Sequence, residues 1–290
     1  MTIKIAFAMA LVALALLAAK PAHAKIAITS CTPTFVAKTP GATYDIAANL
    51  TASGNCINVT APGVTISLGG FSMTGNGTGS GIYIAPGKTG VQVIGPGYIS
   101  GFNIGVVDLG NSALIQSATI FSNAAGGIFL SAVDGSVAAD NYVVKNGVFG
   151  ILLQNTTNSV AQYNTASTNG TFGIWVQNNS TTATLSSHND IVGNEANQNV
   201  LGIWVGYNGT VAACPAVPPS ASNVIVNNNP VDTNVQIGIG LQCNTAQNTT
   251  VLNNVANLGE PLGGYDGTAG CGTNFWDVDT FIAVNQPCVK

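Results

Sequence analysis

The sequence contains no arginine, and only 6% of its residues are charged. Two of the seven lysines precede Lys25, so the rest of the chain carries five lysines against eleven acidic residues, a formal balance of −6. Proteins that bind nucleic acid neutralise phosphates with Lys and Arg, and anionic lipid surfaces attract the same cations. The composition therefore argues against both partners. It predicts a surface built mainly from the uncharged residues Asn, Thr, Ser, Gln and Gly, which suits sugar binding as well as simple solubility.

A second long apolar run is also missing. The run at Ile5–Ala19 follows Lys4 and precedes the small-residue sequence Ala22-His23-Ala24. This order is typical of a cleaved secretory signal peptide over residues 1–24, and the run is shorter than the ~20 residues of a membrane-spanning helix. We therefore expect residues 25–290 to form a single secreted or periplasmic domain without a membrane span.

Cysteines are few, and none forms a C-x-x-C pair or a Cys/His cluster, so no redox or zinc motif is present. All six lie beyond residue 24, and an even number in an exported chain predicts disulfides. We predict that neighbours in sequence pair, with the first and last pairs stapling the two ends of the fold. These pairs are Cys31–Cys56, Cys214–Cys243 and Cys271–Cys288.

Beyond residue 24 the sequence shows no helical periodicity. It consists of short runs of alternating apolar residues separated by Gly and Pro. A Gly followed by an apolar pair that straddles one residue recurs at Gly81, Gly127, Gly150, Gly173 and Gly202. The last four are separated by steps of 23, 23 and 29 residues. A fixed period in this range, built from short strands, is the signature of a parallel β-solenoid. We predict an all-β fold with coils of roughly 22–27 residues.

Asparagines keep the same period and form two sets. The set that stands four residues before the Gly is Asn123, Asn146 and Asn169. The second set is Asn141, Asn164 and Asn189. Stacked asparagine amides bond to one another and to turn backbone, so both sets have a structural explanation. Asp108 occupies an aliphatic position of the repeat, and we expect a one-residue β-bulge to turn it outward.

The repeat also divides the chain. We expect residues 25–75 to form an N-terminal cap and the first coils, residues 76–257 the main coils, and residues 258–290 a C-terminal cap. Residues 207–222 are rich in proline, which interrupts a sheet interior, and are expected to leave the coil as an excursion.

Three features carry a resemblance to a known family: the coil repeat, the segment APGVTISLGGFSMTG at 61–75, and the tail CGTNFW at 271–276 that closes with Cys288. By these features, residues 25–290 resemble exported bacterial right-handed parallel β-helix repeat proteins of the pectin-lyase-like superfamily. The resemblance implies a right-handed parallel β-helix with capped ends. It implies little about function, because relatives include polysaccharide lyases, hydrolases, epimerases and adhesins.

Equivalent positions on successive coils stack ~4.8 Å apart and form columns on the outside of a solenoid. One column is apolar or aromatic and a neighbouring column carries amides. The candidate binding residues are Tyr83, Phe129, Gln154, Trp175, Gln177 and Trp204. Aromatic rings stack on the apolar faces of sugars and amides bond hydroxyls, so these columns suit polysaccharide. Alternatively, residues 207–222 or another subunit cover the strip.

A second group of candidates is ionisable. Positions beside the second asparagine set place four residues on three neighbouring coils: Asp140, Tyr163, His188 and Asp190. His188 as base and Tyr163 as acid could remove a proton from a uronate sugar. Asp140 and Asp190 are expected roughly 12 Å apart, too far for the paired carboxylates of a glycosidase. These four residues are otherwise solvated turn positions.

The sequence thus predicts an exported β-helix protein that contacts polysaccharide and has no strong catalytic signature. Two alternatives remain open. One is a polysaccharide lyase, epimerase or hydrolase that uses the ionisable group, and the other is an adhesin or scaffold whose aromatic strip binds protein. No cofactor or metal is expected, and the sequence does not indicate an oligomeric state.

Overall fold

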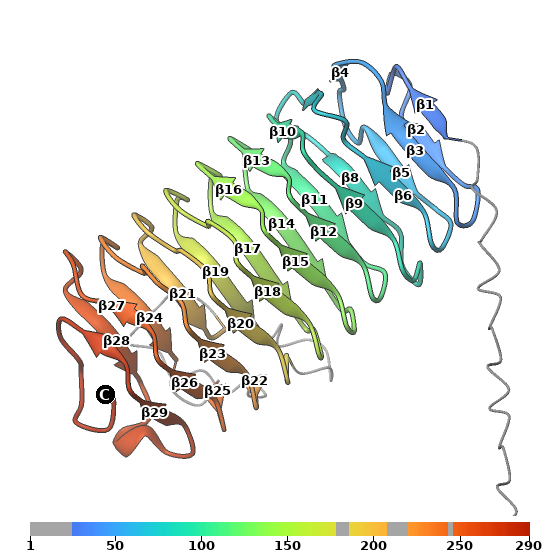
Figure 1. The fold of residues 1–290 in the computed structure, drawn as a ribbon. Coiled ribbons are helices and arrows are strands. Elements are labelled where there is room, and N and C mark those ends of the chain that lie inside the picture. The colour runs from blue at the N-terminus through green and yellow to red at the C-terminus, as the bar shows by residue number, and fades with distance from the viewer. Residues whose placement is uncertain (1–24, 178–185, 208–219, 243–245) are drawn as a thin grey trace, which may run out of the picture.

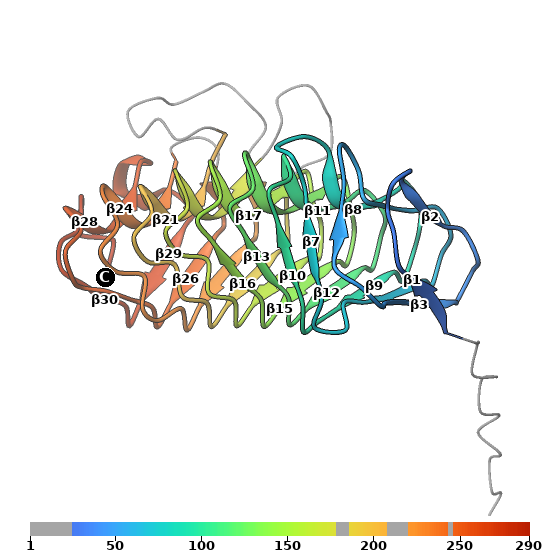
Figure 2. The ribbon, with the colours of Figure 1, turned by 90° about the horizontal axis from the view of Figure 1, so that it is seen from above.

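The computed structural model describes residues 25–177, 186–207, 220–242 and 246–290. These residues wind into a solenoid whose coils stack in chain order from the N-terminal to the C-terminal end (Figure 1). Among these residues, a ten-stranded sheet and an eleven-stranded sheet occupy the two long sides of the solenoid (Figure 2). The described ranges hold one short 3-10 helix, η1 (Ala269–Cys271), and none of their helices is long and apolar enough to cross a membrane. This architecture confirms the predicted all-β solenoid.

In the described part of the chain, three parallel sheets and two short strand pairs make up the coils. Sheet A consists of β1 (Ile26–Ile28), β3 (Thr43–Ile46), β6 (Thr65–Ser67), β9 (Gln92–Ile94), β12 (Leu114–Gln116), β15 (Val137–Ala139), β18 (Val160–Gln162), β20 (Asp190–Val192), β23 (Val224–Val226), β26 (Thr250–Leu252) and β29 (Phe275–Asp277). Sheet B consists of β2 (Phe35–Ala37), β5 (Ile57–Val59), β8 (Ser80–Ile84), β11 (Ile104–Asp108), β14 (Gly126–Ser131), β17 (Phe149–Gln154), β19 (Phe172–Gln177), β21 (Leu201–Val205), β24 (Ile237–Leu241) and β28 (Leu262–Asp266). Sheet C consists of β4 (Leu50–Thr51), β7 (Ser72–Thr74), β10 (Tyr98–Ser100), β13 (Thr119–Phe121) and β16 (Tyr142–Val144). The short pairs are β22 (Ser220–Ala221) with β25 (Ala246–Gln247), and β27 (Val255–Ala256) with β30 (Thr280–Phe281).

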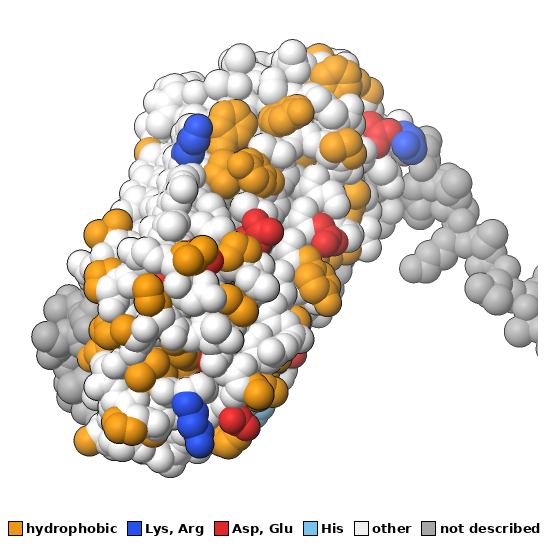
Figure 3. Space-filling model, turned by 60° about the vertical axis from the view of Figure 1, so that its left-hand side comes forward, with side chains coloured by type: hydrophobic (Ala, Val, Ile, Leu, Met, Phe, Trp, Pro, Cys, Tyr) orange, Lys and Arg blue, Asp and Glu red, His pale blue; other side chains and the backbone are white. Residues whose placement is uncertain are grey.

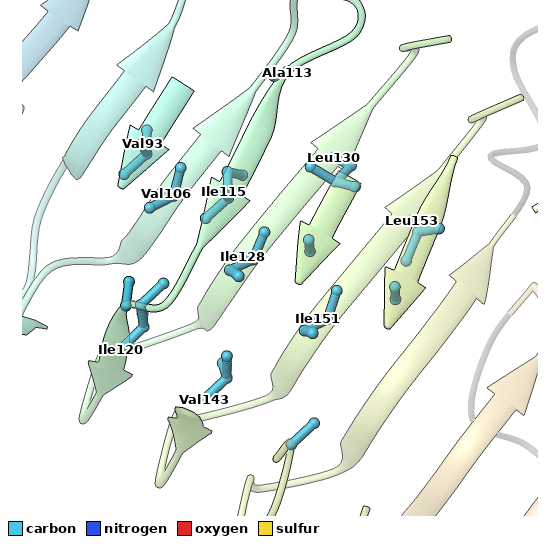
Figure 4. Packing of buried hydrophobic residues seen from close by; sticks show 14 of the residues in the cluster. Val93, Val106, Ala113, Ile115, Ile120, Ile128, Leu130, Val143, Ile151 and Leu153 are labelled. Atoms are coloured by element: carbon cyan, nitrogen blue, oxygen red, sulfur yellow. The ribbon is translucent and has the colours of Figure 1, made fainter. Parts of the chain in front are cut away.

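Aliphatic side chains fill the interior of the solenoid. Along β14, Ile128 and Leu130 are fully buried while the residue between them faces outward, and Ile151 and Leu153 repeat the pattern on β17. Figure 4 shows these side chains pointing into the same interior as Ile115 of β12. The period of two residues along a strand produces this alternation, and each fully buried aliphatic side chain contributes about 1.5–3 kcal/mol.

The repeated Gly and the first asparagine set belong to one structural device. A Cβ on Gly150 would lie 2.6 Å from the carbonyl oxygen of Gly173 and 2.7 Å from Asn169 Nδ2. One coil earlier in the same ladder, the backbone N and Nδ2 of Asn146 both donate to Asn169 Oδ1 at 3.1 Å. The glycine is therefore required, because the next coil's backbone and asparagine pass too close for a side chain. Asn123 donates to Asn146 in the same way, which confirms this set.

The second asparagine set differs from the prediction at its last member. Asn141 donates to Asn164 Oδ1 through both its backbone N and its Nδ2, at 3.0 Å. Asn164 continues the ladder to Asn194, 30 residues later, and not to Asn189. Asn189 lies in the turn before sheet A, where its Oδ1 accepts a bond from the backbone N of Ser159 at 3.1 Å. The placement of Asn189 in this set is wrong because this coil is longer than 22–27 residues.

Asp108 shows a second departure. It pairs in register with Ile84 and Leu130, so β11 contains no bulge at this position. The side chain points inward and is fully buried, where Oδ1 accepts a bond from Gly110 N at 2.9 Å and Oδ2 one from Ser136 Oγ at 2.8 Å. Burial raises the pKa of Asp108, and the two hydrogen bonds offset part of that rise. The predicted outward bulge is wrong because a turn amide and a hydroxyl satisfy the carboxyl group inside.

The two ends carry disulfides. Cys31–Cys56 and Cys271–Cys288 form as predicted, one near each end of the solenoid. Residues 258–290, expected as a C-terminal cap, contribute β28, β29 and β30, which continue the coil ladders. Three sets of residues lie outside the described ones: Cys214 and Cys243, the expected signal peptide at 1–24, and most of the expected excursion at 207–222.

Candidate functional site

The predicted aromatic column is present on the outer face of sheet B. Consecutive Cα partners run through Tyr83, Val107, Phe129, Leu152, Trp175 and Trp204. Parallel pairing in register holds these side chains on one face, since neighbouring strands present equivalent positions to the same side. The sequence repeat therefore identified the column correctly.

The rings of this column are only partly available. A second outward column, with Phe149, Phe172 and Leu201, packs against it and forms an apolar cluster separate from the interior. Phe172 stacks on Trp175 with ring centroids 4.1 Å apart and planes at 17°. Trp204 is fully buried, and it lies where a Cβ on Gly240 would come within 2.4 Å of its ring. Trp204 thus presents no face to solvent, while Tyr83, Phe129 and Trp175 are half-buried.

The amides beside this column already have partners. Gln154 Nε2 donates to Gln177 Oε1 at 2.7 Å, and Gln177 Nε2 donates to the Tyr207 carbonyl oxygen at 2.6 Å. Trp175 Nε1 donates to the carbonyl oxygen of Gly206 at 2.8 Å. These donors bond to backbone and to one another, so a ligand would have to displace existing bonds to use them.

The ionisable residues divide between the two ends of the strands of sheet A. Asp140 and Tyr163 occupy successive coils of the turn between sheets A and C, each with a left-handed backbone, φ 56° and 54°. His188 lies in the turn before sheet A at the level of Asn158, and Asp190 pairs with Val160 of β18. The two turns stand at opposite ends of sheet A's three-residue strands, roughly 16 Å apart.

The expectation that all four residues lie beside one asparagine ladder is therefore wrong. The misplacement of Asn189 caused the error, since His188 and Asp190 flank that residue. The structure brings Asp140 and Tyr163 together and separates them from His188 and Asp190. A catalytic role for the four residues stays a prediction, and no geometry among the described residues supports joint action.

A more exposed aromatic surface lies on sheet C and its adjoining turn. Tyr98, Tyr142 and Tyr163 are 50%, 52% and 60% exposed. Tyr98 pairs with Thr119, Thr119 with Tyr142, and Tyr142 bridges to Thr165 on the next coil. We call these five residues the tyrosine face. The signal for it was in the sequence, because Tyr142 and Thr165 directly follow the ladder residues Asn141 and Asn164.

Polar neighbours and a glycine border the tyrosine face. Asp140 Oδ2 accepts a bond from Gln116 Nε2 at 3.0 Å, and Glu195 Oε2 accepts one from Thr165 Oγ1 at 3.4 Å. A Cβ on Gly193 would come within 2.6 Å of the Tyr163 ring, so the ring rests directly on the backbone of the following coil. The arrangement supplies ring faces, hydroxyls and carboxylates on one open surface.

This surface has no enclosed centre. No pocket and no group of three or more His, Cys, Asp or Glu side chains placed to hold a metal ion occurs in the part of the chain that the structure describes. On the face drawn in Figure 3, charged side chains are few, and other side chains and backbone separate the apolar patches. Such a surface can contact an extended ligand over several coils.

Residues 76–217 match the family model described as a right handed beta helix region. The Dettilon tailspike protein is similar in structure with a TM-score of 0.64 and 16% sequence identity, over 91% of this chain and 61% of the tailspike chain. The A-module of the mannuronan C-5 epimerase AlgE6 from Azotobacter vinelandii gives a TM-score of 0.50 and 10% identity, over 91% of this chain and 90% of the module.

No curated protein matches the sequence. The chain spans about three fifths of the tailspike's length, since it covers 61% of that chain. At identities of 16% and 10%, both likenesses concern the fold alone. Together with the parallel ladders of sheets A, B and C, they confirm the predicted architecture. The chain is a right-handed parallel β-helix protein, with residues 76–217 matching the right-handed β-helix family.

Proposed function

We propose that the protein binds polysaccharide along the tyrosine face. The observation that carries the proposal is the half exposure of three tyrosine side chains on one side of the solenoid, at 50%, 52% and 60%. A ring that keeps this much surface in solvent is not explained by packing, and the apolar ring with a polar tip suits contact with sugars. The proposed function is binding of the polymer and includes no chemical step.

The tyrosine face supports the proposal better than the strip on sheet B. On sheet B, Trp204 is buried and Trp175 is stacked on Phe172, so ring faces are occupied by protein. On the tyrosine face the rings alternate with threonine hydroxyls, and Asp140 adds an acceptor. Ring faces for the apolar side of a sugar and oxygen atoms for its hydroxyls thus occur together.

The fold neighbours are compatible with such a role. The epimerase module is named for action on mannuronan, a polysaccharide, and the present chain covers 90% of that module at a TM-score of 0.50. This likeness supports polysaccharide as the ligand class without specifying its charge, and the tyrosine face supplies the residues.

The test is retention of the protein on immobilised neutral and acidic polysaccharides. The triple variant Tyr98→Ala, Tyr142→Ala and Tyr163→Ala should weaken retention by at least ~2 kcal/mol, given about 1 kcal/mol for each stacked ring. Trp175→Ala is the matched control, because it removes a larger ring on sheet B. Loss of retention in the Trp175 variant with no loss in the triple variant would move the site to sheet B.

We further propose that the protein acts outside the cytoplasm. The two disulfides Cys31–Cys56 and Cys271–Cys288 support this, because structural disulfides persist in oxidising compartments. Fractionation of expressing cells, with N-terminal sequencing of the mature protein, should find cleavage after Ala24. Full-length protein found only in the cytoplasm would contradict the proposal.

A further inference from the structure

In the main column of the tyrosine face, two tyrosine rings stand two coils apart. In its main column Tyr98 is followed by Thr119, then Tyr142, then Thr165, so a ring alternates with a hydroxyl along the solenoid axis. Coils are spaced by the distance between parallel strands, ~4.8 Å, and consecutive rings therefore lie roughly 9.6 Å apart. A ligand that follows this column meets an equivalent ring only once in two steps.

From this period we propose that the site is specific for a neutral polysaccharide in an extended two-fold ribbon, lying parallel to the solenoid axis. The inference rests on the proposed binding function. The length of one pyranose unit in an extended chain is close to the spacing of one coil. In a two-fold ribbon, alternate sugars turn over, so the same sugar face recurs every second unit. Tyr98 and Tyr142 then contact equivalent faces, while Thr119 and Thr165 meet the hydroxyls of the sugars between.

The negative charge of the protein favours an uncharged ligand. Residues 25–290 carry a formal balance of −6 and no arginine, and Asp140 and Glu195 stand beside the tyrosine face. Lys145, just beyond the end of β16, is the nearest lysine in sequence to these residues. A polymer with one carboxylate on each sugar would meet repulsion at both acids and too few cations to neutralise it.

Four hexasaccharides separate these properties. Cellohexaose and mannohexaose are neutral and extended, maltohexaose is neutral and coiled, and a β-1,4-linked uronate hexamer is extended and charged. Titration by calorimetry at low salt should give binding about fivefold tighter or more for the first two, because a loss of about 1 kcal/mol is expected when one stacked ring is not engaged. Equal affinity for maltohexaose would overturn the two-fold ribbon, and equal affinity for the uronate hexamer would overturn neutrality. Both results leave the proposed function standing.

A register change tests the period directly. Thr119→Tyr combined with Tyr142→Thr conserves composition but brings the two rings onto adjacent coils. We expect affinity for the extended hexamer to fall to that of Tyr142→Thr alone, about fivefold below wild type. Full affinity in the double variant would refute the spacing argument. Phe275→Ala serves as control, since Phe275 is 54% exposed on sheet A, away from this face. Thermal unfolding of each variant verifies folding, and the absence of binding to any hexamer in wild type would instead reject the polysaccharide function itself.

Discussion

Asp279 ends the second asparagine ladder, and replacing it by asparagine should stabilise the protein at neutral pH. Its Oδ1 accepts bonds from Asn254 N at 2.7 Å and Asn254 Nδ2 at 2.9 Å, as each ladder asparagine does for the coil before it. Its Oδ2 is buried and has no hydrogen-bond partner. Asn254 places an amide nitrogen at the equivalent position, which donates to the carbonyl oxygens of Ile225 and Leu252 at 3.0 and 3.1 Å. An asparagine at 279 would therefore supply the missing donor.

The pH dependence follows from the carboxyl group. Burial, with a smaller contribution from Asp277, raises the pKa of Asp279 from 3.8 to about 6, against the opposing effect of the hydrogen bonds from Asn254. The folded protein thus holds a proton that the unfolded chain releases between pH 3.8 and about 6. The contribution of the protonated Asp279 carboxyl group to folding stability is complete below pH 3.8 and is lost as the pH rises through about 6.

The magnitude can be worked from this shift. A rise of roughly 2 units corresponds to about 3 kcal/mol, and partial exposure of Asp279 to solvent reduces this to roughly 1–2 kcal/mol. In a domain of this size the melting temperature of Asp279→Asn at pH 7.5 should exceed that of wild type by about 2–8 °C. At pH 4 the two proteins should melt within about 2 °C of each other, since both are then neutral at this position.

The assay is thermal unfolding followed by circular dichroism between pH 4 and pH 8. The matched control is Asp277→Asn, which removes an exposed carboxylate two residues away without changing the ladder. It should give a smaller gain at pH 7.5, because Asp277 affects the Asp279 pKa only as a minor cause. If Asp279→Asn melts no higher than wild type at pH 7.5, or if the Asp277 variant gains as much, the argument from the ladder fails.

Two further predictions concern the coil ladder and its ends. Gly150→Ala should lower the free energy of unfolding, measured in urea, by at least ~2 kcal/mol, because its Cβ would lie 2.6 Å from the Gly173 carbonyl oxygen. The control is Gly87→Ala, whose Cβ meets no atom within 4 Å although φ is 71°, and it should lower the free energy of unfolding by less. A larger loss in the Gly87 variant would contradict the packing argument. Replacing Cys271 and Cys288 by serine should reduce the free energy of unfolding by about 3 kcal/mol, the value expected for a disulfide that closes a loop of 17 residues. Hydrogen exchange should rise first in β28 to β30, and unchanged protection from exchange in these strands would show that the disulfide does not hold this end of the solenoid.

The sequence alone determined the repeat and what the repeat requires. The steps of 23 residues between glycines arise because each coil must present a glycine where the next coil's carbonyl and asparagine approach, and no other residue fits there. The ladder of Asn123, Asn146 and Asn169 is readable for the same reason, since stacked amides need the same residue at the same position. The end disulfides could also be predicted, because neighbouring cysteines one coil or less apart meet without displacing the ladder.

The tertiary structure decided everything that depends on the phase between coils. The step from Asn164 to Asn194 is 30 residues, so a spacing argument misassigned Asn189 and carried His188 and Asp190 with it to the wrong turn. Whether an outward ring is exposed depends on its neighbours in other coils: Gly240 gives Trp204 room to lie buried, whereas the rings of Tyr98 and Tyr142 stand on either side of the smaller Thr119. Likewise, only the partners Gly110 and Ser136 show why a carboxyl group at 108 can point inward. A one-dimensional period specifies which residues stack, but the contacts between stacks are set by the lengths of the coils and the volumes of side chains far apart in sequence.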